Sequence, residues 1–318
     1  MPLTSQENIE NKIFENYSEW QYLFVEFQSK FLAGLYSRYQ SLENGNLVLY
    51  YAKQSHQGIL RLRDYDFNFN ISHEKFWENH LRVTPKQISI IKVGAEINIP
   101  KETARRKISE LIKQKVLNRK NKNIGWLPNE HYKQSYSLFI NEEITNVSKM
   151  INFVCEKNNI SVSNEETIKM LKEKFSFYWF HYLETQLEYL RLWSKQLNDL
   201  EYALILLQVS HIFLAKVKKK LSLKDVYEDF SLIKDFQNAS ISATSISDVT
   251  SIPRATCIRK LELLVKLKLI SQDKTTKRYY LNQNSFSKNL ISQKTTESVV
   301  KLFSKFLFIC IRGINSKT

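Results

Sequence analysis

Two short basic phrases in the sequence carry side chains suited to binding an anion. IPKETARRK spans residues 99–107, and IPRATCIRK spans residues 252–260. Both phrases place an arginine directly before a lysine, and a threonine and a further cationic side chain precede that pair. Guanidinium groups bind phosphate and the guanine edge through paired hydrogen bonds, and a threonine hydroxyl binds either a base or a phosphate. These residue types therefore favour recognition of an anionic partner.

The charge of the whole chain indicates the same kind of partner. Its 318 residues include 47 lysines and arginines against 32 aspartates and glutamates, a net charge of +15. Such a balance implies either nucleic acid or an acidic membrane surface. With 43% hydrophobic residues but only 6 glycines and 5 prolines, the sequence favours a folded protein of long helices. Its length suits two domains of ordinary size.

The residue patterns lack the common enzyme and metal motifs. The six histidines show no HExxH spacing, and the sequence contains no GxSxG and no glycine-rich phosphate-binding loop. Cys155, Cys257 and Cys310 lie far apart, so they form neither a CxxC pair for zinc nor a disulfide framework. We therefore expect a protein that is not an enzyme and that has no cofactor and no metal.

The sequence also gives expectations about location. The first residues, MPLTSQENIENK, contain no apolar core of a signal peptide. The most apolar stretch, residues 202–217, is too short to span a bilayer and carries Gln208, Ser210 and His211. We expect this stretch to form a buried helix, and we expect a cytoplasmic protein with no membrane partner.

The two phrases belong to a longer internal similarity. Residues 99–117 align with residues 252–270, and flanking segments align in the same order, among them 47–56 with 202–211 and 150–155 with 305–310. A matching order of several segments indicates that a unit of about 150 residues occurs twice. We predict a first repeat over residues 1–158 and a second over residues 159–318. The boundary falls in the polar stretch 157–165.

Each phrase lies where a helix–turn–helix and a hairpin are predicted. After the turn Ser251-Ile252-Pro253, apolar residues recur every three or four positions, which places them on the inner face of a helix. Two short apolar segments then flank the basic stretch 273–278, or 118–123 in the first repeat, and they predict a two-stranded ribbon. The predicted inner faces are Ala104, Ile108, Leu111 and Ile112 in the first repeat, and Cys257, Leu261, Leu264 and Val265 in the second.

The polar side chains of these segments are the candidate binding residues. A helix in the major groove of DNA needs long donors near its N-terminus, and a basic hairpin beside it holds phosphates or reaches the minor groove. Other roles stay open, because the threonines can bond the local backbone and the arginines can pair with surface carboxylates. The predicted DNA-contact residues are Lys101, Thr103, Arg105, Arg106, Arg119, Lys120 and Lys122 in the first repeat, and Arg254, Thr256, Arg259, Lys274, Lys277 and Arg278 in the second.

This arrangement resembles the winged helix-turn-helix transcriptional regulators of bacteria, and the MarR type in particular. The shared order is an aromatic N-terminal helix (17–39 or 175–193), a helix ending near His56 or His211, the helix-turn-helix, the wing and a closing helix. The resemblance implies that double-stranded DNA is bound by a dimer of such subunits, here fused as a pseudo-dimer. It also implies a small-molecule effector. The chain departs from the family by the fusion and by insertions at about 57–87 and 218–240.

The predicted fold is therefore mainly α with small β wings, as two tandem winged helix-turn-helix repeats related by a pseudo-twofold axis. The aromatic helices are predicted to form the interface between the repeats. The predicted function is a sequence-specific DNA-binding transcriptional regulator associated with the nucleoid. The alternatives are a plasmid or phage replication initiator with two winged helices, a winged-helix scaffold that binds proteins, and a nucleoid protein with little sequence preference. Further self-association through the insertions stays open.

Overall fold

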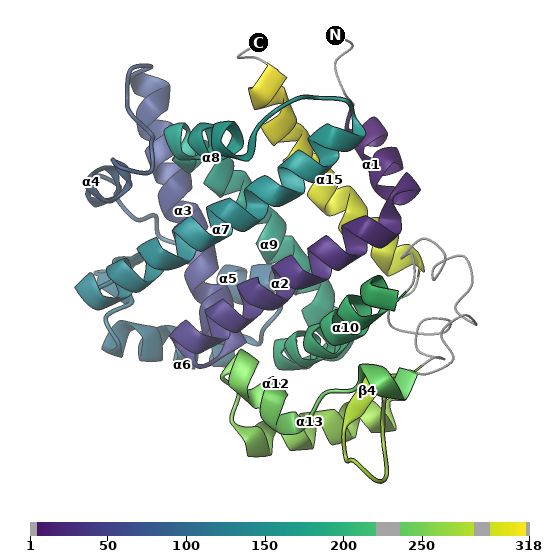
Figure 1. The fold of residues 1–318 in the computed structure, drawn as a ribbon. Coiled ribbons are helices and arrows are strands. Elements are labelled where there is room, and N and C mark those ends of the chain that lie inside the picture. The colour runs from purple at the N-terminus through teal and green to yellow at the C-terminus, as the bar shows by residue number, and fades with distance from the viewer. Residues whose placement is uncertain (1–4, 221–235, 283–292, 316–318) are drawn as a thin grey trace. The chain divides into compact units, whose positions relative to one another are not determined.

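In the computed structural model, the described part of the chain comprises residues 5–220, 236–282 and 293–315. These residues form a mainly helical structure with two small antiparallel sheets of two strands each (Figure 1). The predicted class, mainly α with small β ribbons, is confirmed. Most of the predicted insertion at 218–240 lies outside the described residues. Among the described helices, none is both long and apolar enough to cross a membrane.

The described elements fall into two series, one on each side of the connection at residues 158–163. The first series consists of α1 (Gln6–Glu15), α2 (Tyr17–Tyr39), α3 (Leu42–Tyr65), α4 (Phe76–Leu81), α5 (Ile90–Ile97), α6 (Lys101–Lys113), β1 (Leu117–Lys120), β2 (Asn123–Trp126) and α7 (Glu130–Lys157). The described elements of the second series are α8 (Asn164–Glu173), α9 (Phe175–Leu197), α10 (Leu200–Lys220), the 3-10 helix η2 (Phe236–Ala239), α12 (Ala243–Thr250), α13 (Arg254–Lys266), β3 (Ile270–Gln272), β4 (Tyr279–Leu281) and α15 (Gln293–Asn315).

Corresponding elements of the two series have matching lengths. Helices α1 and α8 each contain 10 residues, and α2 and α9 each contain 23. Helices α5 and α12 each contain 8 residues, and α6 and α13 each contain 13. The turns after α2 and α9 match as well, because Gln40 and Asn198 both adopt left-handed φ values, 53° and 58°. Among the described elements, the order thus corresponds before and after the connection between α7 and α8, except that the 3-10 helix η2 stands where the first series has α4.

Two compact units make up the chain, and neither coincides with one half of the sequence. The first unit consists of residues 1–9, 43–195 and 302–318, and the second consists of residues 10–42 and 196–301. Helix α2 therefore belongs to the unit that contains α10, α12 and α13, whereas α9 belongs to the unit that contains α3, α5 and α6. The compact units thus differ from the predicted repeats 1–158 and 159–318, because each half contributes a long aromatic helix to the other unit.

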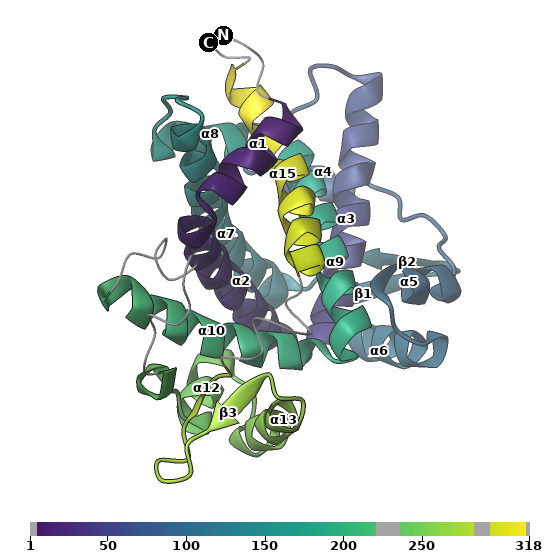
Figure 2. The same cartoon turned by 90° about the vertical axis from the view of Figure 1, so that its right-hand side faces the viewer.

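In the second unit, α10 is the helix on which the others assemble. It contacts α2, α12, α13, β4 and η2 (Figure 1). Residues 203–210 of α10 are buried without interruption. The β3–β4 ribbon lies beside α13 (Figure 2). The prediction of a buried helix over residues 202–217 is therefore confirmed for these central residues.

In the first unit, α9 contributes a buried row of aromatic residues to the core. The Tyr182 hydroxyl donates a hydrogen bond of 2.6 Å to Glu143 Oε2 on α7, and the Tyr182 ring lies 5.7 Å from the Phe306 ring on α15. Near the other end of α9, Ser194 Oγ accepts a hydrogen bond of 3.1 Å from Asn98 Nδ2, directly after α5. Helix α9 thus links the two closing helices to the helix–turn–helix of this unit.

A second aromatic cluster in the first unit surrounds α4. The Phe76 ring stacks on the His56 ring at 4.7 Å and on the His80 ring at 5.8 Å between centroids. Phe175 of α9 and Trp126 of β2 lie 5.4 Å and 6.1 Å from the same ring. The short helix α4 therefore fastens the inserted segment to α3, to α9 and to the β1–β2 sheet.

The predicted ends of two helices are wrong. Helix α3 continues past His56 to Tyr65, and α10 continues past His211 to Lys220. Neither stretch contains a proline, and the single glycine, Gly58, is tolerated inside a helix. The predicted insertion at 57–87 therefore begins as helix, and its irregular parts are residues 66–75 and the segment that follows α4.

Candidate nucleic-acid interface

The ends of the helix–turn–helix segments are fixed by local sequence. Ser242 caps α12 by accepting a hydrogen bond of 3.0 Å from the Ser245 N–H. The helix ends at Ser251, whose left-handed φ of 61° reverses the chain, and Pro253 stands at the N-cap position of α13. The predicted turn 251–253 is therefore confirmed. In the first unit the same positions are occupied by Ser89, Asn98 and Pro100.

The inner faces of α6 and α13 match the prediction. Three of the four predicted residues in each helix are fully buried, and the fourth is half-buried because it lies at the edge of the apolar face. The buried residues are Ala104, Ile108 and Leu111 in α6 and Cys257, Leu261 and Leu264 in α13, and the half-buried ones are Ile112 and Val265.

The lysine that ends each phrase is buried, a role that the sequence did not indicate. Lys107 is 9% exposed and Lys260 is 4% exposed. Lys107 Nζ lies 2.9 Å from Glu43 Oε2 in the first turn of α3. Lys260 Nζ lies 3.0 Å from Glu201 Oε2 in the first turn of α10. Each of the two helices α6 and α13 is thus tied by its lysine to the start of a long helix in its own unit.

Lys260 has the larger set of partners. Its ammonium group also donates a hydrogen bond to Asp199 and lies 4.6 Å from the centroid of the Tyr202 ring. Burial alone lowers the pKa of Lys260, but the hydrogen bonds to Asp199 and Glu201 outweigh that effect and raise the pKa above its ordinary value. The lysine therefore stays charged, and the ion pair persists at neutral pH.

The arginine that precedes each lysine has the opposite environment. Arg106 and Arg259 are exposed, and neither guanidinium forms an ion pair or hydrogen bond with another described residue. Thr103 and Thr256 are half-buried, and their hydroxyls form no hydrogen bond within the described part of the chain. Pairing of these two arginines with surface carboxylates and bonding of these two threonines to the local backbone are therefore not seen within the described residues. The arginine donors are exposed, and the threonine hydroxyls lie at the edge of the helix surface.

Two other predicted residues are engaged within their own unit. Arg105 Nε lies 2.7 Å from Glu102 Oε2, one turn earlier on α6. The hydrogen bond from Arg105 lowers the pKa of Glu102, so this carboxylate is charged. Arg254 Nε donates a hydrogen bond of 3.1 Å to Thr244 Oγ1 on α12. Arg105 is therefore paired with a carboxylate. Lys101, at the start of α6, is an exposed cation.

The first ribbon has a tighter turn than predicted. The two strands pair as far as Lys120, which lies opposite Asn123. Only Asn121 and Lys122 remain for the turn, and Asn121 adopts the left-handed φ of 58° that asparagine tolerates. Arg119 and Lys120 therefore lie on β1 rather than in a six-residue tip, and they are exposed together with Lys122.

The second ribbon has the predicted long turn, and a carboxylate organises it. Asp273 Oδ1 accepts a hydrogen bond of 2.6 Å from the Thr276 N–H inside the turn. Arg278 donates hydrogen bonds of 2.9 Å and 3.2 Å to the Ser240 carbonyl oxygen and hydroxyl, so it anchors the ribbon to the segment before α12. The remaining exposed cations of this turn are Lys274 and Lys277.

Each unit thus brings together, on one helix and an adjacent ribbon, the residues predicted for one helix–turn–helix and its wing. Apart from Arg105, Arg254 and Arg278, which are engaged within their own unit, the predicted side chains are unpaired cations and hydroxyls on fixed elements. Such groups suit non-covalent binding of phosphates and base edges. Within the described residues, no three or more histidine, cysteine, aspartate or glutamate side chains are grouped to hold a metal ion. Comparisons with protein-family models, with curated proteins and with solved structures found no match to this chain.

Proposed function

We propose that the chain is a sequence-specific transcriptional regulator that binds double-stranded DNA, with α6 and α13 as recognition helices and the two ribbons as wings. In this proposal, the two series of elements are winged helix-turn-helix repeats of the MarR type, related by a pseudo-twofold axis and acting at the nucleoid. One observation carries it: the same arginine–lysine pair ends both phrases, with the lysine buried in an ion pair and the arginine exposed and unpaired.

The different environments of the lysine and the arginine support a binding role for the arginines. The buried lysine holds each helix in place through its ion pair, so the backbone that carries the neighbouring guanidinium is fixed. A guanidinium on a fixed backbone loses less conformational freedom when it binds a guanine edge or a phosphate. The net charge of +15 adds the long-range attraction that DNA-binding proteins use.

The two recognition helices differ in the residues that would distinguish bases. Helix α6 presents the Glu102–Arg105 pair, whereas Ala255 and Ile258 occupy the corresponding positions of α13. Arginine favours guanine and glutamate accepts from cytosine, whereas apolar side chains contact the thymine methyl group. We therefore expect the two half-sites of the bound DNA to form an imperfect palindrome.

Replacing Arg106 or Arg259 by alanine is expected to weaken binding to the preferred DNA site by about 1–3 kcal/mol each, because one base-edge or phosphate contact is lost. The preferred site is first selected from a random duplex library with the full chain, and affinities are then measured by fluorescence anisotropy at one salt concentration. The matched controls are Lys113→Ala and Lys266→Ala, at exposed lysines in the last turn of the same helices. Equal affinity of both arginine variants and the wild type would rule out this assignment of the site.

The wing lysines are expected to act on phosphate alone. Lys122→Ala and Lys274→Ala should weaken binding about equally for preferred and unrelated duplexes, and each should reduce the slope of log K against log salt by about 1. Salt titrations of the two variants on both duplexes provide the measurement. A changed base preference with an unchanged slope would contradict a phosphate role for these residues.

A genome-wide footprint separates this function from its alternatives. Enrichment at promoters is the expected result. Enrichment at repeated sequences of a replication origin would instead favour an initiator, and the absence of any mobility shift at low salt would favour a protein scaffold.

A further inference from the structure

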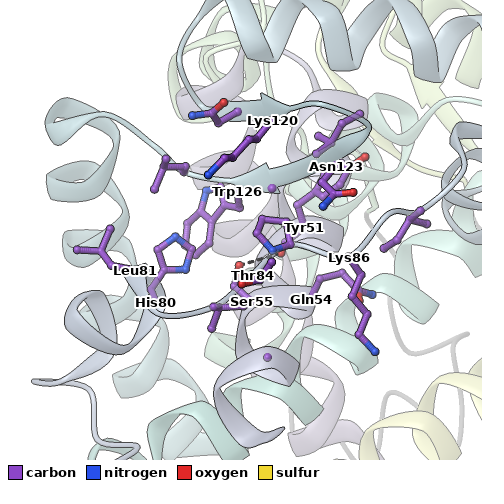
Figure 3. Close-up of a pocket in the computed structure, with 18 of the residues that line it drawn as sticks. Tyr51, Gln54, Ser55, His80, Leu81, Thr84, Lys86, Lys120, Asn123 and Trp126 are labelled. Atoms are coloured by element: carbon purple, nitrogen blue, oxygen red, sulfur yellow. Dashed lines mark hydrogen bonds between the residues drawn. The ribbon is translucent and has the colours of Figure 1, made fainter. Parts of the chain in front are cut away.

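Three cationic side chains gather beside the ribbon of the first unit. Arg61 on α3, Lys86 in the segment after α4 and Lys120 on β1 line one cavity of about 300 Å³ between these elements (Figure 3). Among the described residues that line it, none is an aspartate or glutamate, and none of the three cations forms an ion pair with another described residue. Lys86 and Lys120 are exposed, and Arg61 is half-buried. Because a cleft lined by charges of one sign concentrates counter-ions, this cation cluster favours an anionic partner.

The segment that carries Lys86 is packed against two walls of the cavity. A Cβ atom on Gly58 of α3 would lie 2.3 Å from Val83 Cγ1, and one on Gly125 of β2 would lie 2.5 Å from Pro85 Cγ. Because these two glycines carry no side chain, Val83 and Pro85 pack directly against α3 and the ribbon. The backbone at Lys86 is therefore fixed by its neighbours. This segment belongs to the insertion, by which the chain departs from the regulators it resembles.

The cation cluster lies next to elements that are proposed to bind DNA. Lys86 stands three residues before Ser89, the cap of α5, which is the first helix of the helix–turn–helix. In helix–turn–helix complexes this first helix crosses the DNA backbone while the second enters the major groove. Lys120 belongs to the ribbon itself. Arg61 lies 18 residues (61 − 43) beyond Glu43, the ion-pair partner of α6, which is about 27 Å along α3.

The second unit has different residues at the corresponding positions. Extending the alignments of 47–56 with 202–211 and of 99–117 with 252–270 pairs the three cations with a lysine, an alanine and an aspartate: Arg61 with Lys216, Lys86 with Ala239 and Lys120 with Asp273. Lys216 donates a hydrogen bond to the Asn238 carbonyl oxygen, and Asp273 accepts hydrogen bonds within its own turn. The charge at the three positions is therefore +3 in the first unit and zero in the second, where the lysine and the aspartate cancel.

We propose that the cation cluster binds backbone phosphates in the flank of the half-site that α6 reads. This inference rests on the proposed function. The three cations neutralise phosphates without reading bases, and each contact releases about one counter-ion. The corresponding described residues of the second unit supply no such set of cations. The cluster thereby orients the chain on a nearly palindromic site, because only one of the two flanks gains these contacts.

Duplexes shortened from one end test this inference on the full chain. The half-site that α6 reads is identified in the selected duplex as the one whose base substitutions lose their effect in Arg106→Ala. Shortening the flank of that half-site by one base pair at a time should weaken binding at least about fivefold, whereas shortening the opposite flank should not. In the double variant Arg61→Met/Lys86→Met, neither flank should matter. Fluorescence anisotropy at one salt concentration provides the affinities.

Salt titrations of the same variant give a second readout. The double variant should reduce the slope of log K against log salt by about 2, since two phosphate contacts are lost. The matched control is Lys149→Met/Lys169→Met, which removes the same charge at exposed positions of α7 and α8 in the same unit. This control should bind like the wild type. Methionine keeps most of the apolar stem of each side chain, and equal midpoints of urea unfolding would show that all variants are folded.

The outcomes separate this inference from the proposed function. A wild type that binds its selected duplex with the same slope and the same dependence on both flanks as the double variant would overturn the role of the cation cluster and leave the proposed function intact. An equal loss in the control variant would show that only the net charge of the chain matters, and it would also overturn that role. Failure of the wild type to bind any duplex would overturn both proposals.

Discussion

Replacing Lys260 by methionine is expected to lower the free energy of unfolding of the second unit by about 3 kcal/mol. Methionine keeps most of the length and apolar contact of the side chain but removes the charge. The carboxylates of Asp199 and Glu201 then lie close together without their cation. Removing one member of a buried ion pair costs about 3–5 kcal/mol, and the partial exposure of Asp199 places this case near the lower end.

The second unit contains one tryptophan that reports on this loss. Trp20 is 1% exposed on α2, and the other tryptophans of the sequence belong to the first unit. Urea unfolding followed by the ¹⁹F signal of Trp20 in 5-fluorotryptophan-labelled protein therefore measures the unit directly. Lys266→Met, at an exposed position of the same helix, should change stability by less than about 0.5 kcal/mol. An equally small effect of Lys260→Met would show that the ion pair does not hold α13 in place.

The first unit is expected to lose stability as the pH falls from about 6.5 to 4. Burial lowers the pKa of His80 to about 4, and it also lowers the pKa values of His56 and His73. These histidines are neutral when folded, so the unfolded chain binds more protons once the pH drops below 6.5. Each such histidine contributes a slope of up to about 1.4 kcal/mol per pH unit in that window and none above it.

Neighbouring charges act in the same direction for two of these histidines. Lys133 lowers the pKa of His80 and Lys172 lowers that of His73, whereas Glu74 raises the latter. Urea unfolding at pH 7, 6 and 5, followed by the ¹⁹F signal of Trp126, measures the slope. His80→Phe should reduce it by up to the contribution of one proton. His131→Phe, at an exposed histidine of the same unit, is the matched control. A stability that is flat between pH 7 and 5 would contradict the prediction.

The local parts of the fold were predictable because their causes are local. The apolar spacing after Pro100 and Pro253 predicts the inner faces of α6 and α13, and the turn between helices needs only a short polar stretch. The first ribbon was predicted with too long a tip, since Arg119 and Lys120 read as loop residues. Their long stems are compatible with a strand, and a single asparagine with positive φ is sufficient for the turn.

The parts that depend on distant residues were not predictable from one sequence. Lysine is usually a surface residue, so nothing near Lys107 or Lys260 indicates burial. Their partners, Glu43 and Glu201, lie 64 and 59 residues earlier (107 − 43 and 260 − 201). The same holds for Tyr51, His80 and Trp126, which line one cavity although they lie on three separate elements.

The distribution of α2 and α9 between the units has a consequence for synthesis on the ribosome. Helix α2 ends at Tyr39, and its partner α10 begins at Leu200, so 160 residues (200 − 39 − 1) lie between them. At about 5–20 residues per second, the ribosome begins to synthesise α10 roughly 10–30 seconds after it completes α2. Its apolar side chains, Phe24, Phe27 and Phe31 among them, stay uncovered during that time. A nascent chain that stops near residue 158 therefore lacks α10 and α12, the helices that α2 contacts in the second unit.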